Sequence, residues 1–152
     1  MKKLSLFLLA AVALGACKKD SETTPSTSKT DLLTSHNWKP SAGTFSITAG
    51  GQTISSDAFE SCDKDDAYKF NSDKTLVVDA GTNKCSSSDP QKETGSWALS
   101  SGDQKLTITL PSQVIPLSDV DIKELTTTTL HLSGTQSFNG SSYTVDVTFV
   151  AQ

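Results

Sequence analysis

The side chains that could carry out acid–base or nucleophilic chemistry are few in this sequence. Its two histidines, His36 and His131, lie far apart, and no Gly-x-Ser-x-Gly turn is present to expose a nucleophilic serine. His131 alternates with Leu130 and Leu132, which predicts that it faces solvent on a strand. We therefore expect that the protein has no catalytic residues and is not an enzyme.

Patterns that could bind a metal are also weak. Asp63-Lys64-Asp65-Asp66 is the densest group of carboxylates, but it lacks the Asp-x-Asp-x-Asp-Gly progression of a calcium loop. A zinc site needs three or four nitrogen or sulfur ligands, which two histidines and a pair of cysteines do not readily supply. We expect residues 63–66 to form a solvated loop, and calcium binding by these carboxylates is the alternative. We expect the protein to hold no metal and no cofactor.

The N-terminus has the layout of an export signal. Lys2 and Lys3 precede an apolar run over 4–14, and Gly15 and Ala16 follow as small residues at a cleavage point. The apolar run is shorter than the roughly 20 residues that span a bilayer. The sequence Leu-Gly-Ala-Cys at 14–17 resembles the lipobox of bacterial lipoproteins, which implies cleavage of residues 1–16 and lipidation of Cys17.

The segment after Cys17 carries no large apolar residue up to position 30. It buries too little surface to offset its ordering entropy, so we predict a flexible tether over 17–30. Two or three acyl chains on Cys17 would hold the protein on a membrane. The charged opening of the tether resembles an export tag of some Gram-negative bacteria, although a plain solvated linker also explains it. We expect the protein to be anchored to the outer membrane, either at its periplasmic face or at the cell surface.

Two further cysteines, Cys62 and Cys85, remain once Cys17 is lipidated. In an exported protein such a pair is most simply a disulfide, and free thiols or metal ligation are the alternatives. The chain-entropy model assigns a loop of this length about 3 kcal/mol of stabilisation. We predict that the pair braces the fold.

Residues 31–152 have the size of one domain and an acidic charge. The chain holds 13 lysines, no arginine and 17 acidic residues, a net charge of −4, which becomes −6 without Lys2 and Lys3. A cationic groove for nucleic acid is therefore excluded. We expect a monomer whose partners are the membrane, through Cys17, and a small hydrophobic ligand.

Two-residue alternation of apolar side chains predicts β-strands through the second half of the chain. Hairpins are predicted to join 68–70 to 76–78, 95–99 to 106–110, and 122–125 to 128–132, each across a polar turn. The segment 112–115 lies between two prolines and should be an edge or a connection. A closing strand over 143–149 would direct Tyr143, Val145, Val147 and Phe149 to the interior.

The front of the domain gives fewer signals. A hairpin is predicted between 45–47 and 52–54, with Gly50 and Gly51 at its tip. Ahead of it, 30–35 has a capping residue and room for about a turn of helix, which would cap an end of the sheet. Eight or so short strands favour an all-β barrel or sandwich, and the short turns favour an eight-stranded up-and-down barrel.

Several aromatic, glycine and cysteine positions together resemble a known family. They are Leu32-Leu33, Trp38, the run 66–76, Cys85, the run 93–99, the run 122–126 and the final strand. This order is similar to that of the small lipocalin-like domains in exported lipoproteins of Bacteroidota-type bacteria. The resemblance implies a single eight-stranded barrel and a cavity for an apolar or amphiphilic molecule.

Six aromatic residues are candidates for lining such a cavity, with packed core as the alternative. They are Trp38, Tyr68, Phe70, Trp97, Tyr143 and Phe149. The leading hypothesis is a barrel that binds a small apolar or amphiphilic ligand without catalysis. The competing hypothesis is a filled barrel whose loops bind a membrane-protein partner or a glycan. A cavity beneath Trp97 and Tyr143, open at one end, would favour the first hypothesis.

Overall fold

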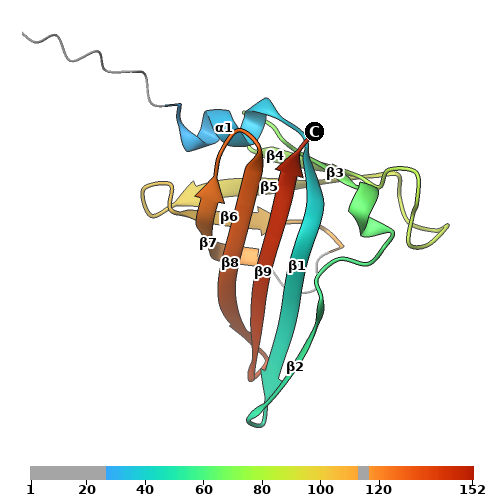
Figure 1. Cartoon of the computed structure of the whole chain (residues 1–152), viewed down its shortest axis with the longest axis vertical. Helices are drawn as coiled ribbons and strands as arrows, with labels where there is room; N and C mark the ends of the chain where they lie inside the picture. The colour runs from blue at the N-terminus through green and yellow to red at the C-terminus, as the bar shows by residue number, and fades with distance from the viewer. Residues whose placement is uncertain (1–26, 113–116) are drawn as a thin grey trace, which may run out of the picture.

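The computed structural model describes residues 27–112 and 117–152 (Figure 1). The predicted signal, Cys17, most of the predicted tether and residues 113–116 of the predicted connection lie outside the described residues. Within the described part, no helix is both long and apolar enough to cross a membrane. The elements are α1 (Lys29–Ser35), β1 (Trp38–Ala49), β2 (Gln52–Asp57), η1 (Asp63–Asp65), β3 (Ala67–Phe70), β4 (Thr75–Asp79), β5 (Lys92–Ser100), β6 (Lys105–Thr109), β7 (Leu117–Leu125), β8 (Thr129–Phe138) and β9 (Ser141–Ala151).

The strands form one antiparallel sheet that closes on itself, because β9 pairs back with β1. Both β2 and β3 pair with the same edge of β1: β2 lies along 44–49, and β3 meets β1 at Trp38 and Tyr68. These two short strands therefore share one position in the barrel. The result confirms the predicted eight-stranded up-and-down barrel, and it confirms each predicted hairpin.

Helix α1 covers one end of the barrel, as expected. It starts at Lys29, so Lys29 and Thr30 belong to the helix and not to the predicted tether. Ser28 caps the helix by accepting the backbone N–H of Asp31, and the Asp31 carboxylate accepts the N–H of Ser28. This reciprocal pair satisfies two of the N–H groups that have no partner inside the helix.

The core lies directly beneath this helix. Leu33 of α1 and Trp38 of β1 are completely buried, and every strand of the barrel except β2 contributes buried apolar side chains. The alternation on β9 is as predicted, since Val145, Val147 and Phe149 are buried while their neighbours face outward. The remaining core residues are Phe70, Leu76, Val78, Trp97, Leu106, Ile108, Val120, Ile122, Leu130 and Leu132.

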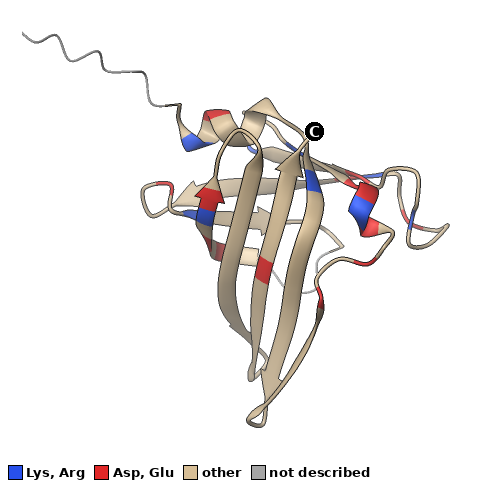
Figure 2. Cartoon of the chain, viewed as in Figure 1, with Lys and Arg blue, Asp and Glu red and all other residues tan. Residues whose placement is uncertain are grey.

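Four strands continue past the barrel at the end away from α1 (Figure 1). We call residues 44–56 of β1–β2 and 133–145 of β8–β9 the ribbon. Its two hairpins end at Gly50-Gly51, both with positive φ as a tight primed turn requires, and at Asn139-Gly140. No charged residue occurs in the ribbon, and Figure 2 shows the lower ends of β1, β2, β8 and β9 in tan.

Candidate ligand-binding cavity

A half-open cavity of about 460 Å³ lies in the barrel interior, and no residue of α1 is part of its wall. Its volume is within the range of small-molecule sites in proteins. Most of its wall is apolar, and Asp63, Tyr68 and Ser112 are the residues of the wall that carry polar side-chain atoms. The lining residues are Phe45, Ala58, Phe59, Asp63, Tyr68, Ile108, Leu110, Ser112, Leu117, Leu132, Val145, Val147 and Phe149.

An aromatic cluster forms part of this wall. The ring of Phe149 on β9 is met edge-on by Phe59, with centroids 5.5 Å apart, and by Tyr68, with centroids 5.2 Å apart. Phe59 comes from the segment between β2 and η1, which the backbone N–H of Ala58 ties to the carbonyl of Gly43 at 3.1 Å. A side chain at position 43 would collide with Val147 and Ala58, so glycine is needed for this close approach.

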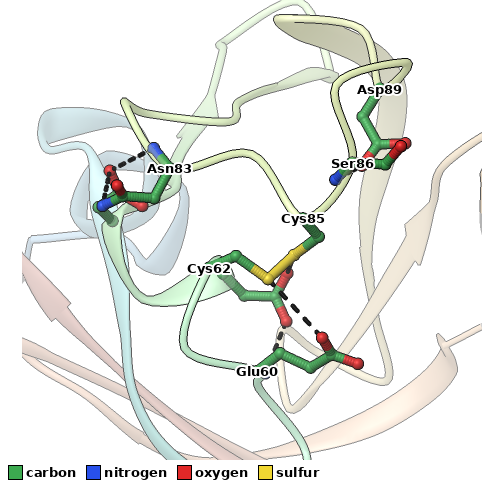
Figure 3. Close-up of a disulfide and its surroundings, with 8 residues drawn as sticks. Glu60, Cys62, Asn83, Cys85, Ser86 and Asp89 are labelled. Carbon is green, nitrogen blue, oxygen red and sulfur yellow. Dashed lines mark hydrogen bonds between the residues drawn. A yellow bond between two sulfur atoms is a disulfide. The ribbon is translucent and has the colours of Figure 1, made fainter.

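The same segment is fastened by the predicted disulfide, which the structure confirms. Cys62 and Cys85 are joined through their sulfur atoms (Figure 3), and their Cα atoms are 5.1 Å apart. Next to it, one carboxylate oxygen of Asp65 accepts the backbone N–H of Thr82 at 2.8 Å and that of Asn83 at 3.1 Å. The disulfide and Asp65 thus hold the 58–66 segment and the 80–90 loop together at the side of the cavity.

Acidic groups dominate the electrostatics of this rim. Burial, and then repulsion from Asp63, Asp65 and Asp79, raises the pKa of Asp66 to about 6. Burial also raises the pKa of the Tyr68 hydroxyl above its ordinary value, and the charges of Asp66 and Asp63 add to the effect. Tyr68 therefore presents a neutral phenol to the cavity at physiological pH.

The geometry around Asp63–Asp66 fits a structural loop. Asp63 accepts the backbone N–H of Glu60 at 2.7 Å, and Asp65 is engaged with the 80–90 loop. Among the described residues, Glu60, Cys62 and Cys85 are the group of potential metal ligands that lie close together. Both of those sulfurs are consumed by the disulfide, so this group offers no thiolate to a metal.

The six candidate aromatic residues fall into three places. Tyr68 and Phe149 line the cavity. Tyr143 lies on the ribbon, stacked on the cavity residue Phe45 with centroids 6.1 Å apart. Trp38, Phe70 and Trp97 are almost fully buried in the core and are not part of the cavity wall.

The cavity lies beside β1, β9 and the 58–66 segment, and neither Trp97 nor Tyr143, beneath which a cavity would have favoured ligand binding, is part of its wall. The indole N–H of Trp97 donates to the carbonyl of Asn71 at 3.0 Å, its ring meets Phe70 edge-on, and the Lys74 ammonium lies 3.8 Å from the ring centroid. These contacts use both the edge and a face of the indole. Through them, Trp97 packs β5 against the β3–β4 hairpin.

Several cavity residues were not among the candidates from the sequence. Four of them are apolar residues on strands in which apolar and polar side chains alternate: Ile108, Leu132, Val145 and Val147. This alternation predicts that they point inward, but it does not predict that they line a cavity. Phe59 lies in an irregular segment without periodicity, and no sequence signal pointed to it.

The histidines are not brought together. His131 lies on β8 and its Nε2 is 2.9 Å from a carboxylate oxygen of Asp146 on β9, on the face of the sheet opposite the cavity. His36 follows α1, and its ring meets the Trp38 ring edge-on at 6.1 Å. The outward direction predicted for His131 is confirmed, and neither histidine lines the cavity.

A closed antiparallel barrel of eight strand positions, with a helix over one end and an apolar cavity in its interior, is the architecture of a small ligand-binding barrel. The chain belongs to the lipocalin-like domain family, whose model matches residues 36–132. The match begins just before β1 and ends within β8. No curated protein matches this sequence.

Proposed function

We propose that this protein is a lipid-anchored lipoprotein of the bacterial outer membrane whose barrel binds a small apolar or amphiphilic ligand without catalysis. The cavity of about 460 Å³ is the observation that carries the binding part of this proposal. An apolar molecule bound there would remove the apolar wall from water and gain contacts with it. The phenol of Tyr68 and the carboxylate of Asp63 offer polar contacts to an amphiphile.

The competing hypothesis is a filled barrel that serves as a scaffold for loops that bind a membrane-protein partner or a glycan. A filled barrel has no space of ligand size, so the cavity favours the ligand-binding hypothesis. Members of the lipocalin-like family are generally non-catalytic, which supports a binding role. The separation of His36 from His131 supports the same conclusion.

Anchoring rests on the lipobox-like sequence at 14–17 and on the tether that follows it. Expression of the full chain in a Gram-negative host with labelled palmitate tests this part. Label is expected in the wild type at the mass of a chain that starts at Cys17, and C17A should lose both label and membrane association. Label that persists in C17A would refute anchoring through Cys17.

Ligand binding is tested by native mass spectrometry of the protein purified from its own host. A co-purifying small molecule is expected in the wild type. V145F, which fills the cavity, should lose it, whereas V150F on the outer face of the same strand should retain it. Repeated isolation of an empty barrel, or equal retention in both variants, would contradict the proposal.

A further inference from the structure

The ribbon has two faces of opposite character. On its outer face, hydroxyl side chains pair across the strands: Ser46 with Ser55 at 2.8 Å, Thr48 with Thr53 at 2.8 Å, and Thr135 with Thr144 at 2.9 Å. On its inner face the strand register aligns Ile54 of β2, Ile47 of β1 and Tyr143 of β9 in one row. The outer face of the ribbon thus carries paired hydroxyls. The inner face carries its large apolar side chains, and Gln136 of β8 and Ser56 of β2 lie at the margins beside Tyr143 and Phe45.

The inner face is apolar but uncovered. Ile54 is 75 % exposed, Phe138 is 40 % exposed and Ile47 is 37 % exposed. Tyr143 stacks on Phe45 and meets the edge of Phe138, so the aromatic rings form a continuous surface. Exposed apolar residues that gather on one face of an uncharged segment mark an interaction surface.

This surface is continuous with the cavity. Phe45 and Val145 pair directly across β1 and β9 and line the cavity, and the next inward pair along the same strands is Ile47 and Tyr143. Along β9 the inward side chains run from Phe149 in the cavity to Tyr143 on the ribbon. Six residues of strand correspond to about 20 Å, so the apolar strip is long and only a few side chains wide.

We propose that the ligand is chain-like, with one part inside the barrel cavity and the rest along the inner face of the ribbon over Ile47, Ile54 and Tyr143. This inference rests on the proposed ligand-binding function and specifies its ligand class. A compact molecule would fill the cavity and leave the strip exposed. An alkyl or acyl chain covers both, because it is narrow and extended.

Other occupants fit the two faces less well. A bilayer would meet both faces of the ribbon tip, and the outer face presents rows of paired hydroxyls, which are costly to bury in hydrocarbon. A second copy could pair with β2, which among the described residues pairs only with β1, but this arrangement would leave the inner face open. A chain that lies on the inner face alone leaves the hydroxyls in water.

The test uses n-alkyl maltosides below their micellar concentrations, titrated by calorimetry into the mature protein. In the wild type, affinity should rise about fourfold for each added methylene, and the rise should continue beyond the length that the cavity alone accommodates. The double variant I47S/I54S should bind short chains as the wild type does and lose about tenfold or more for the longest chains. The control S46A/S55A changes the same two strands on the outer face and should bind every length normally.

Each result separates this inference from the proposed function. One outcome is that short chains bind, that V145F abolishes this binding, and that the affinity stops rising at the same chain length in the wild type and in I47S/I54S. In that case the cavity binds a ligand, and the chain-like inference is wrong. If no length binds, the proposed function fails and the inference fails with it. If sedimentation shows a wild-type dimer that I47S/I54S converts to monomer, the strip is a self-association surface and the inference is overturned. Circular dichroism verifies that each variant is folded.

Discussion

The indole N–H of Trp38 donates a hydrogen bond to the carbonyl oxygen of Leu33 at 2.9 Å, and both residues are completely buried. Helix α1 has seven residues, which is too short for a helix to be stable on its own. Its position therefore depends on tertiary contacts: this bond, the buried Leu33 side chain, and the Lys69 ammonium that donates to the Thr34 carbonyl at 3.0 Å. The contacts make α1 part of the barrel core.

The first prediction concerns this helix. L33A should lower the free energy of unfolding by about 2–5 kcal/mol, because it leaves a cavity beneath α1 that the barrel cannot close. L32A on the same helix changes a partly exposed leucine and should cost clearly less. Urea denaturation followed by circular dichroism measures both values. Equal losses for the two variants would show that α1 does not act as a buried plug.

The second prediction concerns the disulfide. Replacing both cysteines, as in C62S/C85S, should lower the free energy of unfolding by about 3 kcal/mol, because the unfolded chain gains freedom across the 23-residue separation. Reduction of the wild type should produce the same loss. Denaturation of the oxidised protein, the reduced protein and the variant provides the comparison, and identical midpoints for all three would refute the bracing role.

The third prediction is a pH dependence from Asp66. Its pKa is about 6 in the folded protein against 3.8 for an ordinary aspartate, because burial and the neighbouring carboxylates Asp63, Asp65 and Asp79 disfavour the charge. Between pH 3.8 and pH 6 the folded state binds the proton of Asp66 more tightly than the unfolded state does. The contribution of this protonation to the free energy of unfolding is therefore complete below pH 3.8 and is lost as the pH rises through 6. D66N, which mimics the protonated form, should therefore gain stability over the wild type progressively across this window.

Asp121 provides a control of opposite sign. Lys105 and Lys123 lower its pKa to about 2, so its contribution is present above pH 3.8 and is lost as the pH falls through 2. Across pH 4–6 the stability difference between D121N and the wild type should stay flat, while that of D66N grows. Urea midpoints at several pH values measure both differences, and a flat D66N difference would contradict the raised pKa.

The barrel could be predicted from the sequence because its signals are local. Alternation along β9 and the polar turn Asn71–Lys74 each specify strands within a few residues, and the structure follows both. The interruption between β2 and β3 was not predicted. It arises because Ala58 and Phe59 leave the sheet to cover the cavity, a contact between distant segments that leaves no pattern in the chain.

The cavity could be predicted only in outline for the same reason. Alternation places Trp97 and Phe149 alike on the inward side of a strand, but it does not tell which inward residues pack against each other and which face a space. That distinction depends on partners far along the chain: Phe70 and Lys74 cover Trp97, whereas Phe149 meets Phe59 at the cavity wall. A set of candidates chosen only because they are aromatic and point inward therefore contains both core residues and cavity residues.

The last prediction separates these two groups. W97F removes the hydrogen bond from the indole N–H to the Asn71 carbonyl, which keeps the backbone N–H of Lys74 as a donor, and it leaves part of the space of a buried indole unfilled. Together these losses should lower the free energy of unfolding by about 1–3 kcal/mol. The affinity of W97F for dodecyl maltoside should equal that of the wild type, because Trp97 is outside the cavity wall. Y68L keeps an apolar side chain in the wall but loses the ring contact with Phe149 and the phenol, so its affinity should fall by about tenfold.

Calorimetry and urea denaturation of the two variants give the four values needed. The expected result is a crossed pattern, in which W97F loses stability at constant affinity and Y68L loses affinity by more than its stability change explains. Tryptophan emission provides an independent check, since Trp38 and Trp97 both lie outside the cavity and should change little when the ligand binds. A loss of affinity in W97F equal to that in Y68L would place the binding site beneath Trp97 and would contradict a site in the cavity that Tyr68 and Phe149 line.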